Sequence, residues 1–230
     1  MLAFQRRIFM TKSYRAIFSA AALLASMHVE AQHDFERSLV YMLPVYCKYA
    51  PDFNQRNFGG HDPTEVQRWR TLMGPTFIHI HHYCYGLMDV NRAVFLAKTR
   101  EDRMHNYYQS VNEFDYVIER ATPDFSLLPE VLTKKGESLI ALGRAGEAMF
   151  EFERAIKIKP DYSPAYAAAS DFYKENGKLG KAREWLAKGL SAAPDASALK
   201  RRLAELDKLK DKSGAARRPT GNPAAPSSPD

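Results

Sequence analysis

A run of histidines and two cysteines are the side chains of this chain that could do chemistry. In the segment HIHHYC, residues 79–84, helical spacing places His79 and His82 on one face and His81 beside Cys84 on another. Either pair could hold a transition metal, but known zinc sites need three or four converging ligands, and the patterns HExxH and CxxCH are absent from the sequence. We therefore expect packing of these rings and no bound cofactor, with metal or haem ligation by His79 and His82 as the alternative.

Cys47 and Cys84 are the only cysteines of the chain. An even cysteine count in an exported protein favours a disulfide, and two reduced, buried thiols are the alternative. A Cys84 thiolate beside His81 would be a nucleophile, but the sequence shows no third orienting group or oxyanion-stabilising element. We therefore predict that the protein is not an enzyme.

Residues 1–31 have the pattern of a secretory signal peptide. Basic residues precede an apolar run at 16–27, and Val29-Glu30-Ala31 forms a small-x-small cleavage pattern. The apolar run has 12 residues, fewer than the roughly 20 that a membrane span requires. A retained membrane anchor and a mitochondrial transit peptide are the alternatives. We expect export, to the periplasm of a bacterium, with no stable membrane span after cleavage.

The charge balance argues against a nucleic-acid partner. The whole chain has a net charge of +6, but without residues 1–31 it has 29 Lys and Arg against 26 Asp and Glu. At the other end, residues 210–230 are rich in Pro, Ala, Ser and Gly, with little that a core could bury. We predict that this last segment is a disordered tail.

Apolar periodicity and capping residues predict helices through most of the remaining chain. An apolar segment at 35–49 is expected to be helical, and Asp62 caps a short helix that begins with Pro63. Two longer helices are expected at 75–98 and 101–120. A last amphipathic helix at 197–209 has four leucines on one stripe, namely Leu199, Leu203, Leu206 and Leu209.

Two segments of the second half superimpose at an offset of 34 residues. Residues 129–162 and 163–196 match at turn glycines, small residues, large apolar residues and final prolines: Gly143 with Gly177, Ala148 with Ala182, Phe152 with Leu186, Ala155 with Gly189, and Pro160 with Pro194. Small side chains let adjacent helices approach closely, and large ones fill the space between them. A fixed period of this length is typical of helix-turn-helix solenoids.

These matched positions resemble the tetratricopeptide repeat. Lys135 and Ser170 depart from its pattern, since the family usually has leucine and glycine there. The resemblance implies an all-α fold, a right-handed solenoid of helical hairpins. Its parts are an N-terminal helical extension at 32–74, a divergent helix pair and possible repeat at 75–128, repeats at 129–162 and 163–196, and a capping helix at 197–209.

Members of this family bind ligands along the concave surface formed by the first helix of each repeat. When the family's positions are aligned with the two repeats of this sequence, that surface comprises Glu130, Thr133, Glu137, Ile140, Ala141, Ala167, Asp171, Lys174 and Glu175. This lining is mixed to acidic, so the resemblance implies a protein or peptide partner with a basic or apolar segment. We expect a scaffold that supports the assembly or stability of a cell-envelope complex. The alternative is a periplasmic metal- or haem-binding protein that uses residues 79–84.

Overall fold

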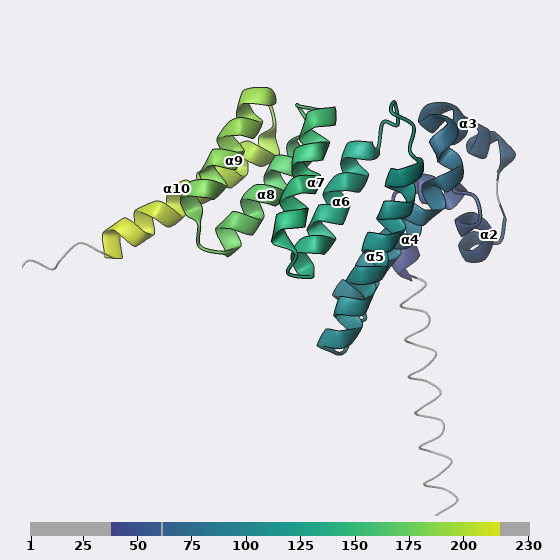
Figure 1. Ribbon diagram of the computed structural model, residues 1–230, viewed down its shortest axis with the longest axis horizontal. Helices are drawn as coiled ribbons and strands as arrows, with labels where there is room; N and C mark the ends of the chain where they lie inside the picture. Colours follow the sequence, from purple (N-terminus) through teal and green to yellow (C-terminus); the bar gives the residue numbers. More distant parts are fainter. Residues whose placement is uncertain (1–37, 61, 217–230) are drawn as a thin grey trace, which may run out of the picture. The chain divides into compact units, whose positions relative to one another are not determined.

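The computed structural model describes residues 38–60 and 62–216, with side chains described up to residue 209. The predicted signal peptide and the chain beyond residue 216 lie outside this range. The regular elements of the described residues are all helical, which confirms the all-α class (Figure 1). The chain divides into two compact units, an N-terminal unit, Met1–Phe125, and a C-terminal unit, Ser126–Asp230.

The first described residues of the N-terminal unit form short helical turns, so the prediction of one helix over 35–49 is wrong. A single helical turn at 38–40 is followed by a bend and then by the 3-10 helix η1, Val45–Tyr49. Pro44 precedes η1 with extended backbone angles and has no N–H to continue a helix. The short helix α2, Phe53–Phe58, was not predicted and ends at Gly59, whose φ is 70°.

Helix α3, Pro63–Met73, begins as predicted. The Asp62 carboxylate accepts hydrogen bonds from the backbone N–H groups of Thr64 and Glu65, at 2.8 and 3.4 Å. Gly74, with a φ of 66°, ends the helix.

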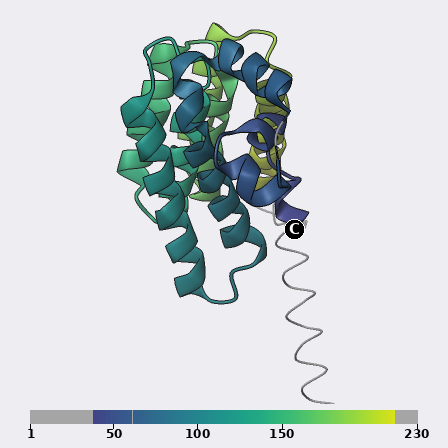
Figure 2. The ribbon, with the colours of Figure 1, turned by 90° about the vertical axis from the view of Figure 1, so that its right-hand side faces the viewer.

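The predicted single helix over 75–98 is instead a 3-10 turn and a shorter α-helix. These are η2, Gly74–His79, and α4, Ile80–Phe95. Residues 96–98 connect α4 to the next helix, α5, Arg100–Arg120. Thr99 caps α5 through a capping box with Asp102. Helices α4 and α5 run side by side as an antiparallel hairpin (Figures 1 and 2).

A disulfide joins the N-terminal segment to α4, as the cysteine pair predicted. Cys47 and Cys84 are bonded, with their Cα atoms 5.7 Å apart, and both are buried. Aromatic rings pack beside the bond: Tyr46 contacts both Trp69 and Tyr83. The disulfide therefore lies inside the core of the N-terminal unit.

The C-terminal unit consists of two helical hairpins and a last helix. The hairpins are α6, Leu128–Ala141, with α7, Ala145–Ile158, and α8, Ser163–Glu175, with α9, Leu179–Ala192. Gly143 and Gly177, which the 34-residue offset aligned, both make the hairpin turns with positive φ, 78° and 70°. The aligned small and large positions are all buried: Ala148, Phe152, Ala155, Ala182, Leu186 and Gly189.

A glycine against a phenylalanine ring sets the close approach of the paired helices. A Cβ added to Gly136 of α6 would lie 2.4 Å from Phe152 Cε1 of α7. In the N-terminal unit, a Cβ on Gly86 of α4 would lie at the same distance from Phe114 of α5. The α4–α5 hairpin therefore shares this contact with the α6–α7 hairpin.

Lys135, which departs from the family pattern, pairs with an acid on the other helix of its hairpin. The Lys135 ammonium lies 2.7 Å from the buried carboxylate of Glu151 on α7, which also contacts Arg154 at 2.7 Å. A buried charge is tolerated when it is paired in this way. A lysine can therefore occupy a position where the family usually has leucine.

The last helix, α10, Ser197–Ala216, covers the second hairpin but is longer than predicted. Leu199 and Leu206 are buried in a cluster with Tyr166, Ala182 and Leu186, whereas Leu209 is exposed. The helix continues to residue 216, so the prediction of a disordered tail from residue 210 is wrong for its first seven residues. Nowhere in the described ranges is a helix long and apolar enough to cross a membrane.

Candidate functional site

A pocket of about 230 Å³ lies on the C-terminal unit between α6 and α8. Helical spacing produces it: Glu137 and Ile140 lie one turn apart on α6, while the α8 side chains recur at intervals of three or four residues. The small side chain of Ala168 leaves room next to the larger ones. The full lining is Glu137, Ile140, Phe152, Ala168, Asp171, Phe172 and Glu175.

Asp171 is held by a neighbouring helix. Its carboxylate accepts two hydrogen bonds from Arg202 Nε on α10, at 3.0 and 2.9 Å, and lies 2.8 Å from Arg202 Nη2. The hydrogen bond that Arg202 donates to Asp171 is the main cause that raises the pKa of Arg202. Lys174 lies between Asp171 and Glu205, at 3.8 and 3.7 Å. The charge of Asp171 is therefore neutralised within the protein.

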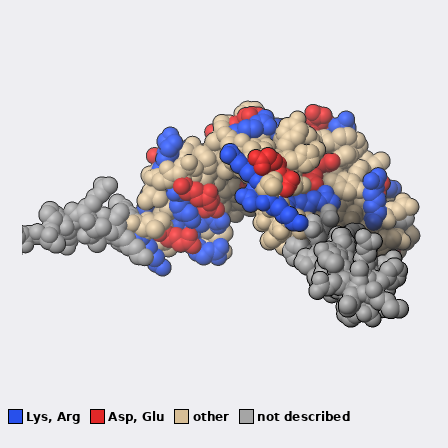
Figure 3. All heavy atoms as spheres, turned by 90° about the horizontal axis from the view of Figure 1, so that it is seen from below, with Lys and Arg blue, Asp and Glu red and all other residues tan. Residues whose placement is uncertain are grey.

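Figure 3 shows acidic and basic side chains lying next to one another on the face it presents, and many charged side chains form ion pairs. Glu137 is among them, since Lys134 lies 2.8 Å from its carboxylate. Glu175 differs: it is exposed, and within the described part of the chain it has no ion-pair partner. Glu175 is therefore the acid of the pocket that is most available to a cation from outside.

Two acidic side chains also affect Tyr162, the half-buried tyrosine that precedes α8. Burial raises the pKa of Tyr162, and the carboxylates of Glu130 and Glu137 raise it further. Both effects disfavour a phenolate. The surface around the pocket is thus acidic even after Asp171 is neutralised.

The structure brings four of the nine predicted groove residues together around this pocket: Glu137, Ile140, Asp171 and Glu175. Glu130, Ala141 and Lys174 do not line it. Thr133 and Ala167 also lie outside the pocket, and they are only 2% and 7% exposed. The Thr133 hydroxyl donates to the carbonyl of Pro129, and Ala167 belongs to the core of the second hairpin.

Three lining residues were missed by the analysis of the sequence. Phe152 had been assigned to packing, and its ring borders the pocket but is fully buried. Ala168 lies three residues before Asp171, and Phe172 lies four residues after Ala168, so extending the helical spacing from Asp171 to Ala168 and then to Phe172 would have found both.

The three histidines of residues 79–84 pack against other rings, and His82 also forms a hydrogen bond. His82 Nδ1 lies 2.6 Å from the Glu113 carboxylate, and its ring stacks on Tyr116 with the centroids 3.6 Å apart. Burial, followed by neighbouring cations, lowers the pKa of His79 and of His81. Cys84 is in the disulfide. Residues 38–60 and 62–216 contain no group of three or more His, Cys, Asp or Glu that could hold a metal ion.

A tyrosine on α4 also has an altered environment. The Tyr85 hydroxyl donates to the Asp52 carboxylate at 3.1 Å, linking α4 to the residue that precedes α2. Burial, and then this hydrogen bond, raises the pKa of Tyr85 to about 12. Tyr85 is therefore a neutral hydrogen-bond donor at physiological pH.

Paired antiparallel helices, small residues at each crossing and a pocket on the first helices define a protein built from helical-hairpin repeats. Residues 139–206 match the family model described as "Tetratricopeptide repeat". The chain therefore contains tetratricopeptide repeats, which confirms the resemblance seen in its sequence.

One curated relative is similar over part of the chain. "Protein O-mannosyl-transferase TMTC1" from Homo sapiens is 24% identical over 107 residues, which are 46% of this chain and 12% of that protein. The chain thus matches only a small part of that relative.

Proposed function

We propose that this chain is a tetratricopeptide-repeat scaffold that binds a protein partner at the pocket between α6 and α8. The observation that carries the proposal is the composition of that pocket. Ile140 and Phe172 provide apolar surface, and Glu137 and Glu175 provide negative charge beside it. A pocket of this kind suits an apolar side chain with a cationic neighbour.

The size of the pocket supports an extended peptide segment as the ligand. Sites for drug-sized ligands enclose about 300–1,000 Å³, and this pocket, at about 230 Å³, is smaller. An apolar side chain of the partner would enter it while an adjacent Lys or Arg approaches Glu175. Asp171 contributes less to the attraction because Arg202 already pairs with it.

Peptide binding tests this proposal. Fluorescence anisotropy would compare short peptides in which Lys or Arg flanks Leu or Phe with peptides of the same length in which Gln replaces the basic residues. Changing Glu137 and Glu175 to lysine should weaken binding of the basic peptides about tenfold or more, since it replaces attraction by repulsion.

The matched control changes Glu153 and Glu184 to lysine. Both are exposed acids, on α7 and α9, so the change in net charge is the same. Equal binding by both double variants, or no preference of the unmodified protein for basic peptides, would contradict the proposal. Far-UV circular dichroism of each variant verifies that the helices are intact.

We further propose that the protein is exported, to the periplasm of a bacterium, and supports a cell-envelope assembly. The leader-like sequence of residues 1–31 supports export, and so does the buried Cys47–Cys84 disulfide, since such bonds persist in oxidising compartments. The test is the intact mass of protein recovered from a bacterial periplasm after expression with its own first residues. Retention of residues 1–31, or two free thiols, would contradict the proposal.

Binding without catalysis is the function that we propose. The relative's name denotes a transferase, but the similarity covers 12% of that protein. The fold supplies a pocket with apolar walls and a carboxylate rim, whose chemistry is recognition.

A further inference from the structure

The hairpin of α4 and α5 is a repeat-like hairpin with additional residues at its turn. Gly86 and Phe114 make the same contact as Gly136 and Phe152. In the sequence, 28 residues separate the first pair and 16 separate the second, so the α4–α5 hairpin has twelve more residues between equivalent positions. Insertions in repeat proteins often form part of a binding face.

The additional residues lie at the turn end of the hairpin. Helix α5 begins ten residues before Ser110, whereas α7 begins three residues before the equivalent Ala148. Helix α4 also continues further past Gly86 than α6 does past Gly136. We call residues 92–106 the tip. Seven more helical residues on α5 lengthen that helix by about 10 Å.

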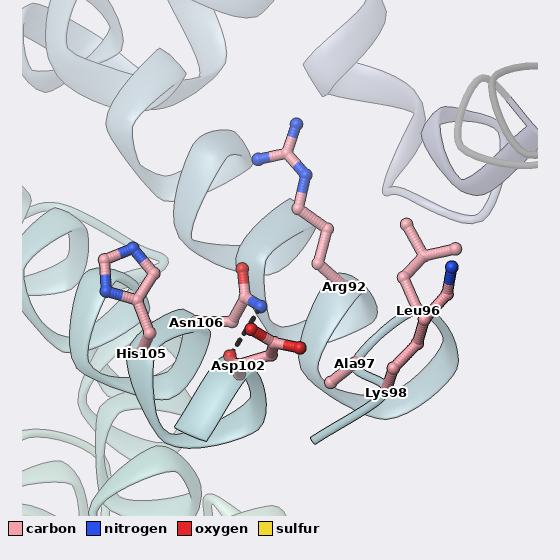
Figure 4. A pocket seen from close by; sticks show the side chains of 7 residues that line it. All are labelled: Arg92, Leu96, Ala97, Lys98, Asp102, His105 and Asn106. Atoms are coloured by element: carbon pink, nitrogen blue, oxygen red, sulfur yellow. Dashed lines mark hydrogen bonds between the residues drawn. The ribbon is translucent and has the colours of Figure 1, made fainter. Parts of the chain in front are cut away.

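The tip has its own pocket, of about 280 Å³. Figure 4 shows Arg92 on one helix, His105 and Asn106 on the other, and Leu96 and Lys98 at the turn between them. Every lining residue belongs to the tip: Arg92, Leu96, Ala97, Lys98, Asp102, His105 and Asn106. The insertion has therefore created a concave surface that a hairpin of ordinary length lacks.

Basic groups outnumber acidic ones in the tip. It contains four Lys or Arg residues and His105, against Glu101 and Asp102. The Asp102 carboxylate accepts the Thr99 N–H in the capping box. Arg92 pairs with Asp89, which lies just before the tip, at 2.8 Å, and basic groups still outnumber acidic ones when Asp89 is counted. The tip thus presents an excess of positive charge.

Apolar side chains are exposed on the same segment. Val94 and Phe95 are 55% and 48% exposed, at the end of α4. They lie in the part of the hairpin that exceeds the length of the other repeats. Exposed aromatic and aliphatic groups next to charged ones are typical of interaction sites.

We propose that the tip is a second interaction surface, which binds an acidic segment of a protein partner. A carboxylate of the partner enters the pocket lined by Arg92, Lys98 and His105, and an adjacent apolar side chain packs on Val94 and Phe95. Charge complementarity identifies the partner as acidic. Glu101 and Asp102 would repel the continuous negative charge of a polyanion, so a peptide with separate carboxylates fits better. The surface shares no residue with the pocket of α6 and α8.

The experiment uses the full chain and short peptides in which Glu or Asp flanks Leu or Phe. Peptides with Gln and Asn in place of the acids are the neutral comparison. Changing Lys98 and Arg100 to glutamate should weaken binding of the acidic peptides about tenfold or more. These changes place acids at the N-terminus of α5, where they favour the helix, so folding is preserved.

Two further variants make the test specific. Changing Lys157 and Lys208 to glutamate removes the same charge from exposed positions on α7 and α10 and should leave binding of the acidic peptides unchanged. Phe95→Ser should weaken that binding without altering the net charge. The Glu137→Lys, Glu175→Lys variant should lose basic peptides and retain acidic ones, which separates this proposal from the proposed function.

The proposal is overturned if acidic peptides bind no more tightly than neutral ones, or if both charge-reversal variants bind them equally. It is also overturned if the chain binds vesicles containing phosphatidylserine through Lys98 and Arg100 but does not bind acidic peptides. That result would assign the tip to a membrane surface.

Discussion

Gly136→Ala tests the close approach of α6 and α7 that defines the repeat. Two effects of this change oppose each other. Alanine is better than glycine in a helix interior by about 1 kcal/mol. Against this, the new Cβ would lie 2.4 Å from Phe152 Cε1, and that ring is fully buried.

The steric effect should dominate. Carbon atoms prefer a separation of about 3.5–4.0 Å, so the ring or the helix must move by about 1 Å. Overpacking of this kind costs about 1–3 kcal/mol, and the contact is with a packed ring rather than with a flexible chain end. We expect a net loss of about 1–2 kcal/mol, which lowers Tm by about 5–10 °C in a unit of this size.

The two tryptophans allow each unit to be followed by itself. Trp69 lies on α3 and Trp185 on α9. In a Trp69→Phe background, fluorescence reports the C-terminal unit alone. Urea unfolding of Gly136→Ala in that background should show a lower midpoint with an unchanged slope.

A neighbouring glycine provides the control. A Cβ on Gly146, in the first turn of α7, would have no heavy atom within 4 Å, so Gly146→Ala should be neutral or stabilising. Stabilisation by Gly136→Ala as large as that by Gly146→Ala would refute the close approach. Adding Phe152→Leu should recover part of the loss, because the next repeat has Ser170 and Leu186 at these positions.

Two further predictions concern cross-links within each unit. Arg202→Ala should reduce stability by about 1 kcal/mol, since it removes a partly exposed bidentate ion pair, and it should strengthen binding of basic peptides by freeing Asp171. A double-mutant cycle with Asp171→Asn measures the coupling, and a coupling of zero would show that the pair does not stabilise the fold. Replacing Cys47 and Cys84 by alanine opens a loop of 37 residues and should cost about 4 kcal/mol in the chain-entropy model. Urea unfolding of a Trp185→Phe background measures that loss, and a change well below 1 kcal/mol would mean that the disulfide does not constrain the unfolded N-terminal unit.

Local patterns in the sequence were sufficient for much of the fold. The 34-residue offset predicted both repeats, because each position of a hairpin has a fixed size requirement at its helix crossing. Asp62 predicted the start of α3, since a cap bonds only to the next few N–H groups. The pattern was misleading where one residue changes the backbone path, as Pro44 does in the segment 35–49.

The candidate site depended more on contacts between distant residues. The spacing placed Glu137, Asp171 and Glu175 on the first helix of each repeat. Arg202, which neutralises Asp171, is 31 residues further along the chain, on the last helix, α10. The burial of Thr133 and Ala167 also depends on how closely the neighbouring helices pack against them. Neither effect is encoded in the period of a single helix.

The sequence alone therefore determined the helical hairpins, their repeat and the cysteine pair, because these depend on short-range spacing and residue size. Only the tertiary structure decided which acids remain available, how Glu151 accommodates Lys135, and how far the α4–α5 hairpin extends beyond the length of the α6–α7 hairpin. The physical reason is that charge pairing and burial are set by the surroundings of a side chain. Those surroundings come from helices far apart in the sequence.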